Sequence, residues 1–217
     1  YCGRKVIQQE SVRAIYTTST PYTSHLIGLR LKRITRLPWL ADFRDPWVGS
    51  FSRSFPTQLH EQVARRMESH VVRTADRITV VSEPMRQAFL SRYTSLEAKH
   101  VLTLPNGYDP DDFLDAEPVE REEKDCMHIT YTGSFYGRRQ PYYFLQSLQA
   151  AINNNCVSRH KVRVWFVGNM NQDVLRQIEA FDLEDVVRMV GYLSHSQSIS
   201  YLLGSDLLLL IIGPGPG

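Results

Sequence analysis

Cysteine is scarce in this sequence, and long apolar runs are missing from it. The cysteines lie far apart, at Cys2, Cys126 and Cys156, and fit neither a metal-ligand nor a dithiol spacing. An odd number of isolated thiols is typical of a reducing compartment, which predicts a cytoplasmic protein. No apolar run reaches the roughly 18 residues of a membrane-spanning helix, and residues 1–10 lack the apolar core of a signal peptide.

The residue patterns of several catalytic classes are also absent. No Ser-His-Asp order, no cluster of metal ligands and no Cys-His pair stands out along the 217 residues. This favours chemistry in which the substrate carries an activated leaving group while the protein supplies positioning and charge. We therefore expect neither a metal site nor a covalent centre.

Charge is divided unevenly along the chain, although the net charge is only +2. Residues 1–110 hold 16 Lys and Arg against 9 Asp and Glu, and residues 111–217 hold 9 against 14, so the halves carry +7 and −5. The basic half suggests an anionic partner or an anionic surface, with scattered solvated charge as the alternative.

Strand-like and helix-like segments alternate along the whole sequence. The expected strands are 14–18, 39–43, 77–81, 101–104, 127–133, 161–168, 186–191 and 206–210. The expected helices are 24–35, 57–75, 82–93, 141–153, 171–182 and 194–204, with Ser24 and Ser82 as N-caps. This alternation predicts the α/β class, with parallel sheets covered by helices on both faces.

A polar segment divides the alternating pattern into two parts. Residues 109–125 contain nine acidic residues and two prolines, which predicts a linker between domains of residues 1–108 and 126–217. Two such units form a cleft between the carboxyl ends of their strands, where open α/β sheets bind ligands. The sequence has no initiator Met and stops just after a strand-like run, so we expect a piece of a longer protein.

A glycine-containing loop in the second half is a candidate anion site. In "ITYTGSFYGRRQP", residues 129–141, Gly133 and Gly137 let backbone N–H groups approach a phosphate, and the following helix adds favourable partial charge. Arg138 and Arg139 can bind phosphate oxygens through their forked guanidinium groups. The alternative is an ordinary strand-to-helix turn with solvated arginines.

Two further predicted strands of this half also end in glycine, at Gly168 and Gly191. Each glycine alone is more simply explained as part of a turn. Three strand-terminal glycines at one edge of one sheet nevertheless favour a nucleobase or ribose close to the backbone.

The first half offers hydroxyl groups and cations at the start of a predicted helix. Thr23, Ser24 and His25 could contact a sugar or phosphate, but helix capping and core packing explain them as well. The cations of this helix suggest contact with an anionic bilayer, and a solvated helix face is the alternative. They are Arg30, Lys32, Arg33 and Arg36.

In the stretch "WLADFRDPWVGS", residues 39–50, a largely apolar strand leads directly to three charged residues, Asp42, Arg44 and Asp45. Two interpretations are open. Either an Arg–Asp pair braces the loop, or the strand delivers these charges to a binding site.

Several stretches together resemble the family 4 retaining glycosyltransferases of GT-B fold. They occur in the family's order and span nearly the whole chain: "YTTSTPYTSHLIGLRLKRITRLPWLADFRDPW", "ADRITVVSEPMRQAF", "VLTLPNGYDPDDF", "ITYTGSFYGRR" and "VRMVGYLSHSQSISYLLGSDLLLL". The resemblance implies two Rossmann-like domains, with the acceptor on residues 1–108 and a nucleotide-sugar on residues 126–217. The family's glycine-rich loop would precede Tyr1, and its paired-glutamate motif would follow Gly217, so this piece alone is expected to be inactive.

The resemblance also implies roles for particular residues of the second half. Gly133, Ser134 and Arg138 would hold the donor diphosphate, with Arg139 as a neighbour. Gly191 and Tyr192 would lie near the nucleobase.

Arg44 and Asp45 stand where many family members carry a histidine that touches the donor sugar. Asp45 could accept the proton of the acceptor hydroxyl, and Arg44 could bind an acceptor phosphate. The acceptor side would also include the hydroxyl-rich helix start with Thr23, Ser24 and His25.

The resemblance therefore implies retaining transfer of a sugar from a nucleotide-sugar to a cell-envelope, polysaccharide or lipid-linked acceptor. It requires no cofactor besides the donor and no nucleic acid, and it places the protein in the cytoplasm or at the inner face of the plasma membrane. Two alternatives are an epimerase that acts on nucleotide-sugars and a non-catalytic module that binds them.

Overall fold

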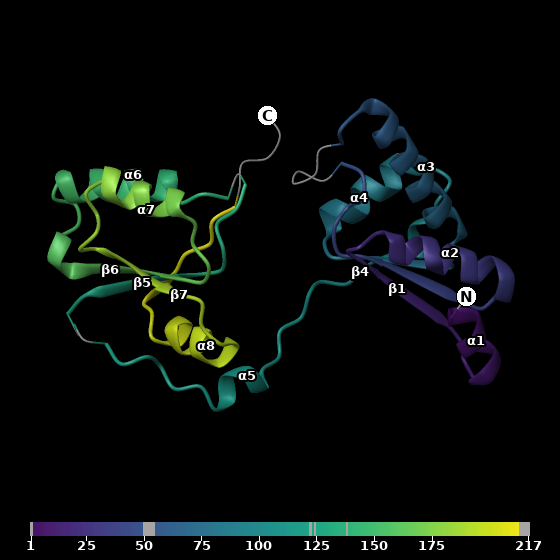
Figure 1. Ribbon diagram of the computed structural model, residues 1–217, viewed down its shortest axis with the longest axis horizontal. Coiled ribbons are helices and arrows are strands. Elements are labelled where there is room, and N and C mark those ends of the chain that lie inside the picture. Colours follow the sequence, from purple (N-terminus) through teal and green to yellow (C-terminus); the bar gives the residue numbers. More distant parts are fainter. Residues whose placement is uncertain (1, 50–54, 122, 124, 138, 213–217) are drawn as a thin grey trace. The chain divides into compact units, whose positions relative to one another are not determined.

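The computed structural model describes residues 2–49, 55–121, 123, 125–137 and 139–212. The chain divides into two compact α/β units, residues 1–107 and residues 108–217, which we call unit 1 and unit 2 (Figure 1). Each unit has its own parallel sheet and its own buried apolar cluster.

Unit 1 alternates strands and helices from its first strand onward. Its elements are α1 (Cys2–Gln9), β1 (Ile15–Ser19), α2 (Thr23–Thr35), β2 (Trp39–Phe43), α3 (Gln58–Thr74), β3 (Arg77–Val80), α4 (Glu83–Arg92), η1 (Ala98–His100) and β4 (Val101–Thr103). The four strands pair in parallel, in the order β1-β2-β3-β4.

The strand order places the three connecting helices of unit 1 on one face of its sheet. Each connection steps to the next strand in the same direction, and right-handed crossovers that all step one way keep their helices on the same side. Alternation alone suggested helices on both faces, but α2, α3 and α4 share one face here (Figure 1).

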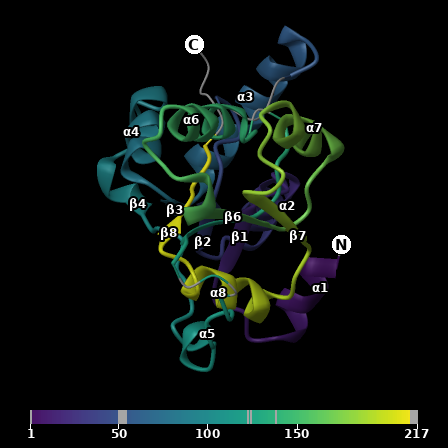
Figure 2. The same cartoon turned by 90° about the vertical axis from the view of Figure 1, so that its left-hand side faces the viewer.

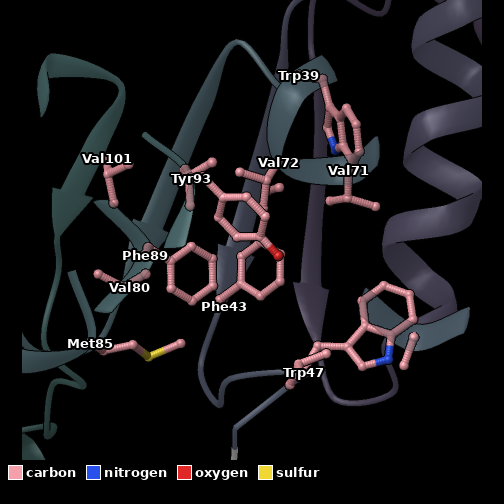
Figure 3. Packing of buried hydrophobic residues seen from close by; sticks show 14 of the residues in the cluster. Trp39, Phe43, Trp47, Val71, Val72, Val80, Met85, Phe89, Tyr93 and Val101 are labelled. Atoms are coloured by element: carbon pink, nitrogen blue, oxygen red, sulfur yellow. The ribbon is translucent and has the colours of Figure 1, made fainter. Parts of the chain in front are cut away.

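The core of unit 1 lies between that face and the helices. Trp39, Ala41 and Phe43 alternate along β2 and are buried, as period-2 burial requires. They pack against an apolar cluster that includes Val71 and Val72 of α3, together with residues of α4 (Figure 3). The sheet edge beyond Phe43 is thereby anchored to a dense core.

Helix α2 lies so close to β2 that one position in it must be glycine. A Cβ added to Gly28 would lie 2.6 Å from the Trp39 ring. The Trp39 indole N–H also donates to Thr17 Oγ1 at 2.9 Å. A rigid ring cannot move aside as a flexible side chain can, so this contact fixes α2 against the sheet.

Two helix starts in unit 1 follow ordinary capping rules, and one differs from the sequence expectation. Thr57 and Ser82 accept backbone N–H bonds as the N-caps of α3 and α4. The prediction of Ser24 as the N-cap of α2 is wrong, because the helix begins one residue earlier and Tyr22 occupies that position. The Ser24 hydroxyl donates instead to the carbonyl of Pro21 at 2.8 Å.

Unit 2 repeats the alternation with a reversal of direction. Its elements are α5 (Asp111–Leu114), β5 (Met127–Thr132), α6 (Tyr142–Asn153), η2 (Arg159–Lys161), β6 (Val162–Val167), α7 (Gln172–Ala180), β7 (Val187–Gly191), α8 (His195–Leu203) and β8 (Leu207–Leu208). The parallel order β7-β6-β5-β8 means that the chain steps outward twice and then crosses back. Accordingly α6 and α7 lie on one face and α8 on the other (Figures 1 and 2).

The acidic segment 109–125 differs from the expected unpacked linker. It contains the short helix α5, and Asp112 accepts from His195 of α8 at 2.9 Å. The Val119 N–H donates to the carbonyl of Ser200 at 2.9 Å, and Arg121 pairs with Asp206. Its polar groups therefore find partners on unit 2, which composition alone does not reveal.

Candidate functional site

Three glycines end adjacent strands at the carboxyl edge of the unit 2 sheet. Gly133 follows β5, Gly168 follows β6 and Gly191 closes β7, with φ angles of +138°, +131° and +86°. The Gly133 N–H donates to Val167 at 2.9 Å, and the Gly168 N–H donates to Gly191 at 2.8 Å. Glycine is favoured wherever the backbone takes positive φ.

Close backbone approach explains one of these glycines directly. A Cβ added to Gly168 would lie 2.1 Å from the carbonyl oxygen of Gly133, so the loops after β5 and β6 touch through bare backbone. A Cβ added to Gly191 or Gly137 would meet no atom within 4 Å. Open space therefore adjoins these two positions, next to a sheet edge that has no side chain at Gly133 or Gly168.

The loop after β5 presents polar and aromatic groups beside this edge. The Arg139 guanidinium lies 5.1 Å from the centroid of the Tyr136 ring, which is a cation–π distance. Burial raises the pKa of Tyr131, while the nearby Arg139 charge opposes that rise. Ser134 is half-buried, and its carbonyl accepts from the Tyr131 hydroxyl. Arg138, the other predicted phosphate ligand, lies outside the described residues.

The residue after the last of the three glycines is an exposed aromatic side chain. Tyr192 is 78% exposed and directly follows Gly191 at the end of β7. The predicted donor residues Gly133, Ser134, Arg139 and Gly191 thus lie with it in the loops that follow β5 and β7.

In unit 1 the strand β2 carries its charges to the carboxyl edge of the sheet. Asp42, still within the strand, accepts hydroxyl bonds from Tyr16 at 3.0 Å, Thr18 at 2.8 Å and Thr79 at 2.6 Å. Arg44 Nε lies 3.8 Å from the same carboxylate. Burial raises the pKa of Asp42, but the three hydroxyl bonds and the Arg44 charge outweigh it, so the net pKa is lowered.

Arg44 and Asp45 differ in how they are held. The guanidinium of Arg44 pairs with Asp42, which agrees with the interpretation of a braced loop, although 61% of the Arg44 side chain is exposed. Asp45 is exposed and makes no hydrogen bond or ion pair within the described part of the chain. Asp45 therefore presents an exposed carboxylate at the edge of the sheet.

The start of α2 lies beside this loop because β1 and β2 are neighbours, with Ser19 paired to Phe43. The Tyr22 hydroxyl donates to the carbonyl of Pro46 at 3.0 Å, and the Tyr22 ring stacks on Trp47 at 5.2 Å. Thr23 is exposed and Ser24 is half-buried at the same helix start. The structure thus brings the predicted acceptor-side residues Thr23 and Ser24 near the Arg44–Asp45 loop.

His25, the third predicted acceptor-side residue, lies in the core instead of at the surface. Its side chain is fully buried, its Nδ1 lies 2.8 Å from Thr17 Oγ1, and its ring packs on Phe43 at 4.4 Å. Burial lowers the pKa of His25 to about 4, although the Asp42 charge opposes the shift. This placement favours a packing role with a neutral imidazole.

The cations of α2 are only partly paired. Lys32 binds Asp76 at 2.7 Å. Arg30, Arg33 and Arg36 are exposed and have no ion-pair partner among the residues that the structure describes. Ile27 and Ile34 are 61% and 51% exposed on the same helix.

Sequence reasoning missed one pair that holds the Arg44–Asp45 loop. Glu68 of α3 is fully buried and binds Arg92 of α4 at 2.9 Å. A signal was present, since Glu68 interrupts the apolar stripe formed by Ala64, Val71 and Val72 along α3.

Within the described ranges, no group of three or more His, Cys, Asp or Glu side chains is arranged to hold a metal ion. No helix in those ranges combines the length and apolar content needed to cross a bilayer.

Comparison with known proteins gives a family match within unit 1 and fold matches that extend across unit 2. Residues 3–107 match the family described as glycosyl transferase 4-like domain. The fold is similar to that of HepE from Anabaena in complex with UDP and glucose, at a TM-score of 0.67 and 15% identity over 95% of this chain and 54% of that one. No curated protein matches the sequence.

Two further solved structures are similar at low identity. One, described as trehalose-6-phosphate from E. coli bound with UDP-2-fluoro glucose, has a TM-score of 0.71 and 12% identity over 94% of this chain and 54% of that one. The other is the lipopolysaccharide outer core galactosyltransferase WaaB in its apo form, with a TM-score of 0.63 and 12% identity over 98% of this chain and 53% of that one. The present chain thus spans about half the length of these proteins.

Two α/β units with parallel sheets, matched across both units by these structures, define the GT-B fold of glycosyltransferases. Residues 3–107, more particularly, match the glycosyl transferase 4-like family. The resemblance seen in the sequence motifs is thereby confirmed.

The buried, neutral His25 predicts a stability that depends on pH. Its folded pKa of about 4 lies below the unfolded value of about 6.5, so the unfolded chain binds the proton first as pH falls. Stability is then fully present above pH 6.5 and is lost between pH 6.5 and 4, by about 3 kcal/mol. Urea unfolding of wild type and His25→Gln across this range measures the difference.

His25→Gln should flatten that pH slope whatever its effect at pH 7. The matched control is His70→Gln, because His70 of α3 is exposed, with its Nδ1 2.8 Å from the Arg66 carbonyl. An equal slope in wild type and His25→Gln would assign the acid loss to other groups.

Proposed function

We propose that the protein transfers a sugar from a nucleotide-sugar to a carbohydrate or lipid-linked acceptor, with retention of anomeric configuration. The observation that carries this proposal is the open carboxyl edge of unit 2, where a Cβ added to Gly137 or Gly191 would meet no atom within 4 Å. Such open glycine positions let phosphate and ribose groups approach the backbone closely. Two of the similar structures are described as bound to UDP or a UDP-sugar.

The donor would lie along the loops that follow β5 and β7. The strand order β7-β6-β5-β8 reverses direction at β5, and ligands of open α/β sheets bind at such a switch point. The loop after β5 would hold the diphosphate through Gly133, Ser134, Arg138 and Arg139. The exposed Tyr192 beside Gly191 would contact the nucleobase.

The acceptor would approach the carboxyl edge of the unit 1 sheet. Its hydroxyl oxygen attacks the anomeric carbon, the bond from that carbon to the phosphate oxygen breaks, and the nucleoside diphosphate departs. The carboxylate of Asp45, which has no partner among the described residues, would accept the hydroxyl proton. Arg44, Thr23 and Ser24 would orient the acceptor. A cell-envelope acceptor is supported by the similarity to a lipopolysaccharide galactosyltransferase.

The donor assignment predicts a selective loss of diphosphate affinity. Arg138→Ala in the full-length protein should weaken binding of UDP by about 10- to 150-fold, since a charge-assisted hydrogen bond contributes roughly 1.5–3 kcal/mol. Uridine should bind almost unchanged, and Arg138→Lys should recover only part of the loss, because a point charge cannot reproduce the fork. Calorimetric titration of UDP and uridine measures both affinities.

Arg188→Ala is the control for this titration, because Arg188 lies near the start of β7, away from its carboxyl end. Equal weakening for UDP and uridine would indicate a damaged loop. Unchanged UDP binding in Arg138→Ala would place the phosphates elsewhere.

The acceptor assignment predicts a turnover defect at Asp45. Asp45→Asn should lower kcat by about 100-fold, the usual scale of general-base catalysis, and leave the donor KM almost unchanged. Both kinetic constants are measured from the release of nucleoside diphosphate from a nucleotide-sugar, with and without acceptor. A non-catalytic module would release no nucleoside diphosphate. Asp173→Asn on the exposed surface of α7 is the control, and a normal rate in Asp45→Asn would remove Asp45 from the chemistry.

We also propose that α2 contacts an anionic membrane where a lipid-linked acceptor would lie. Arg30, Arg33 and Arg36, which are exposed and have no ion-pair partner in the described part of the chain, support this contact together with the exposed Ile27 and Ile34.

Replacing both Arg30 and Arg33 by Gln should weaken binding to phosphatidylserine vesicles by about tenfold or more at low salt, at about 1 kcal/mol for each cation. Co-sedimentation with phosphatidylserine vesicles and with neutral phosphatidylcholine vesicles measures this binding. The control removes the same charge from α3, at Arg66 and Arg73. Equal binding of wild type to both vesicle types would refute the contact.

A further inference from the structure

Helix α3 carries a carboxylate where its apolar face should continue. Glu68 is fully buried between Ala64 and Val71, which both face the core. It accepts from the hydroxyl of Tyr93 and from Arg92 Nη1, the latter at 2.9 Å. Burying a carboxylate is unfavourable unless its oxygens are fully paired, and replacing such a pair by apolar residues is often neutral or stabilising. Core stability alone therefore does not explain Glu68.

The remaining contact of Glu68 is with the loop that follows β2. The Val48 N–H donates to Glu68 Oε2 at 2.9 Å, and the Val48 carbonyl accepts from Arg92 Nη1 at 2.8 Å. Both backbone groups of one loop residue are thus held by side chains of α3 and α4. Val48 lies three residues after Asp45, whose own side chain is exposed.

The backbone next to Val48 is shaped to receive the same arginine. Gly49 has a φ of +81°, and a Cβ added there would lie 2.7 Å from Arg92 Nη2. The guanidinium of Arg92 therefore bridges Glu68, Val48 and the bare backbone of Gly49.

A second anchor holds the loop from the other side. Tyr22 donates to the carbonyl of Pro46 and stacks on Trp47, which is buried. Anchors at Pro46 and Val48 leave little freedom for the backbone between them. Reacting groups that are fixed in advance avoid the entropy cost of being ordered at each turnover.

We propose that Glu68, acting through Arg92 and Val48, is a positioning residue that fixes the loop of residues 44–49 and thereby aims Arg44 and Asp45 at the acceptor. The aiming rests on the proposed function, whereas the anchoring of the loop does not. Glu68 itself touches no substrate.

The test compares Glu68→Gln with Glu61→Gln, the same change on the same helix, where Glu61 only pairs with Arg65 near the surface. In Glu68→Gln, amide hydrogen exchange at Val48 should accelerate by about 10- to 100-fold, as expected for loss of a charge-assisted bond. Amides of β2 and β3 should change little, and Glu61→Gln should match wild type throughout.

Turnover in the full-length protein should fall in parallel. We expect kcat of Glu68→Gln to drop by at least about tenfold, with the donor KM unchanged because the donor contacts lie in unit 2. Gly49→Ala displaces the Arg92 guanidinium without altering any charge, so it should reproduce both effects if Glu68→Gln fails to fold.

Each result decides one part of the inference. Uniform acceleration across all amides of unit 1 would make Glu68 a general stabilising residue and overturn the proposal. Faster exchange at Val48 with normal kcat would also overturn the aiming role. If wild type transfers no sugar, the proposed function fails, and the exchange data still decide whether Glu68 anchors the loop.

Discussion

Parallel strand pairing is the constraint on which the rest of this structure depends. In each unit it brings the carboxyl ends of neighbouring strands to one edge, so residues that are distant in sequence lie close together there. Gly133, Gly168 and Gly191 become a continuous edge because β5, β6 and β7 are adjacent and run the same way. The same rule sets the start of α2 beside the loop that carries Arg44 and Asp45.

Two buried carboxylates of unit 1 serve that edge in different ways. Asp42 accepts three hydroxyl bonds from its two neighbouring strands, β1 and β3, and pairs with Arg44, so its charge is retained within the sheet. Glu68 reaches across from a helix and binds loop backbone. Both are satisfied by polar partners, as buried charges must be. Together they hold the end of β2 and the loop after it, while the nearby Asp45 side chain is exposed.

The two units offer different chemical groups at their sheet edges. Unit 2 offers bare backbone and an exposed aromatic ring, which suit a nucleotide, and unit 1 offers a fixed loop with one cation and one anion, which suits a hydroxyl acceptor. The glycosyl transferase 4-like domain coincides with unit 1, and the similar solved structures extend the likeness across unit 2. The proposed transfer from a nucleotide-sugar would use both sets of groups.

Local sequence patterns determined the elements of this protein. The strand at 39–43, capping at Ser82, and the glycines at strand ends all depend on interactions within a few residues, so they could be predicted. The motif set also indicated the GT-B fold. Only the tertiary structure decided that α2, α3 and α4 share one face, that His25 is buried, and that the acidic segment packs on α8. It alone joined Glu68 to Val48 and Arg92, which lie 20 and 24 residues away, because crossover direction and core packing choose such partners.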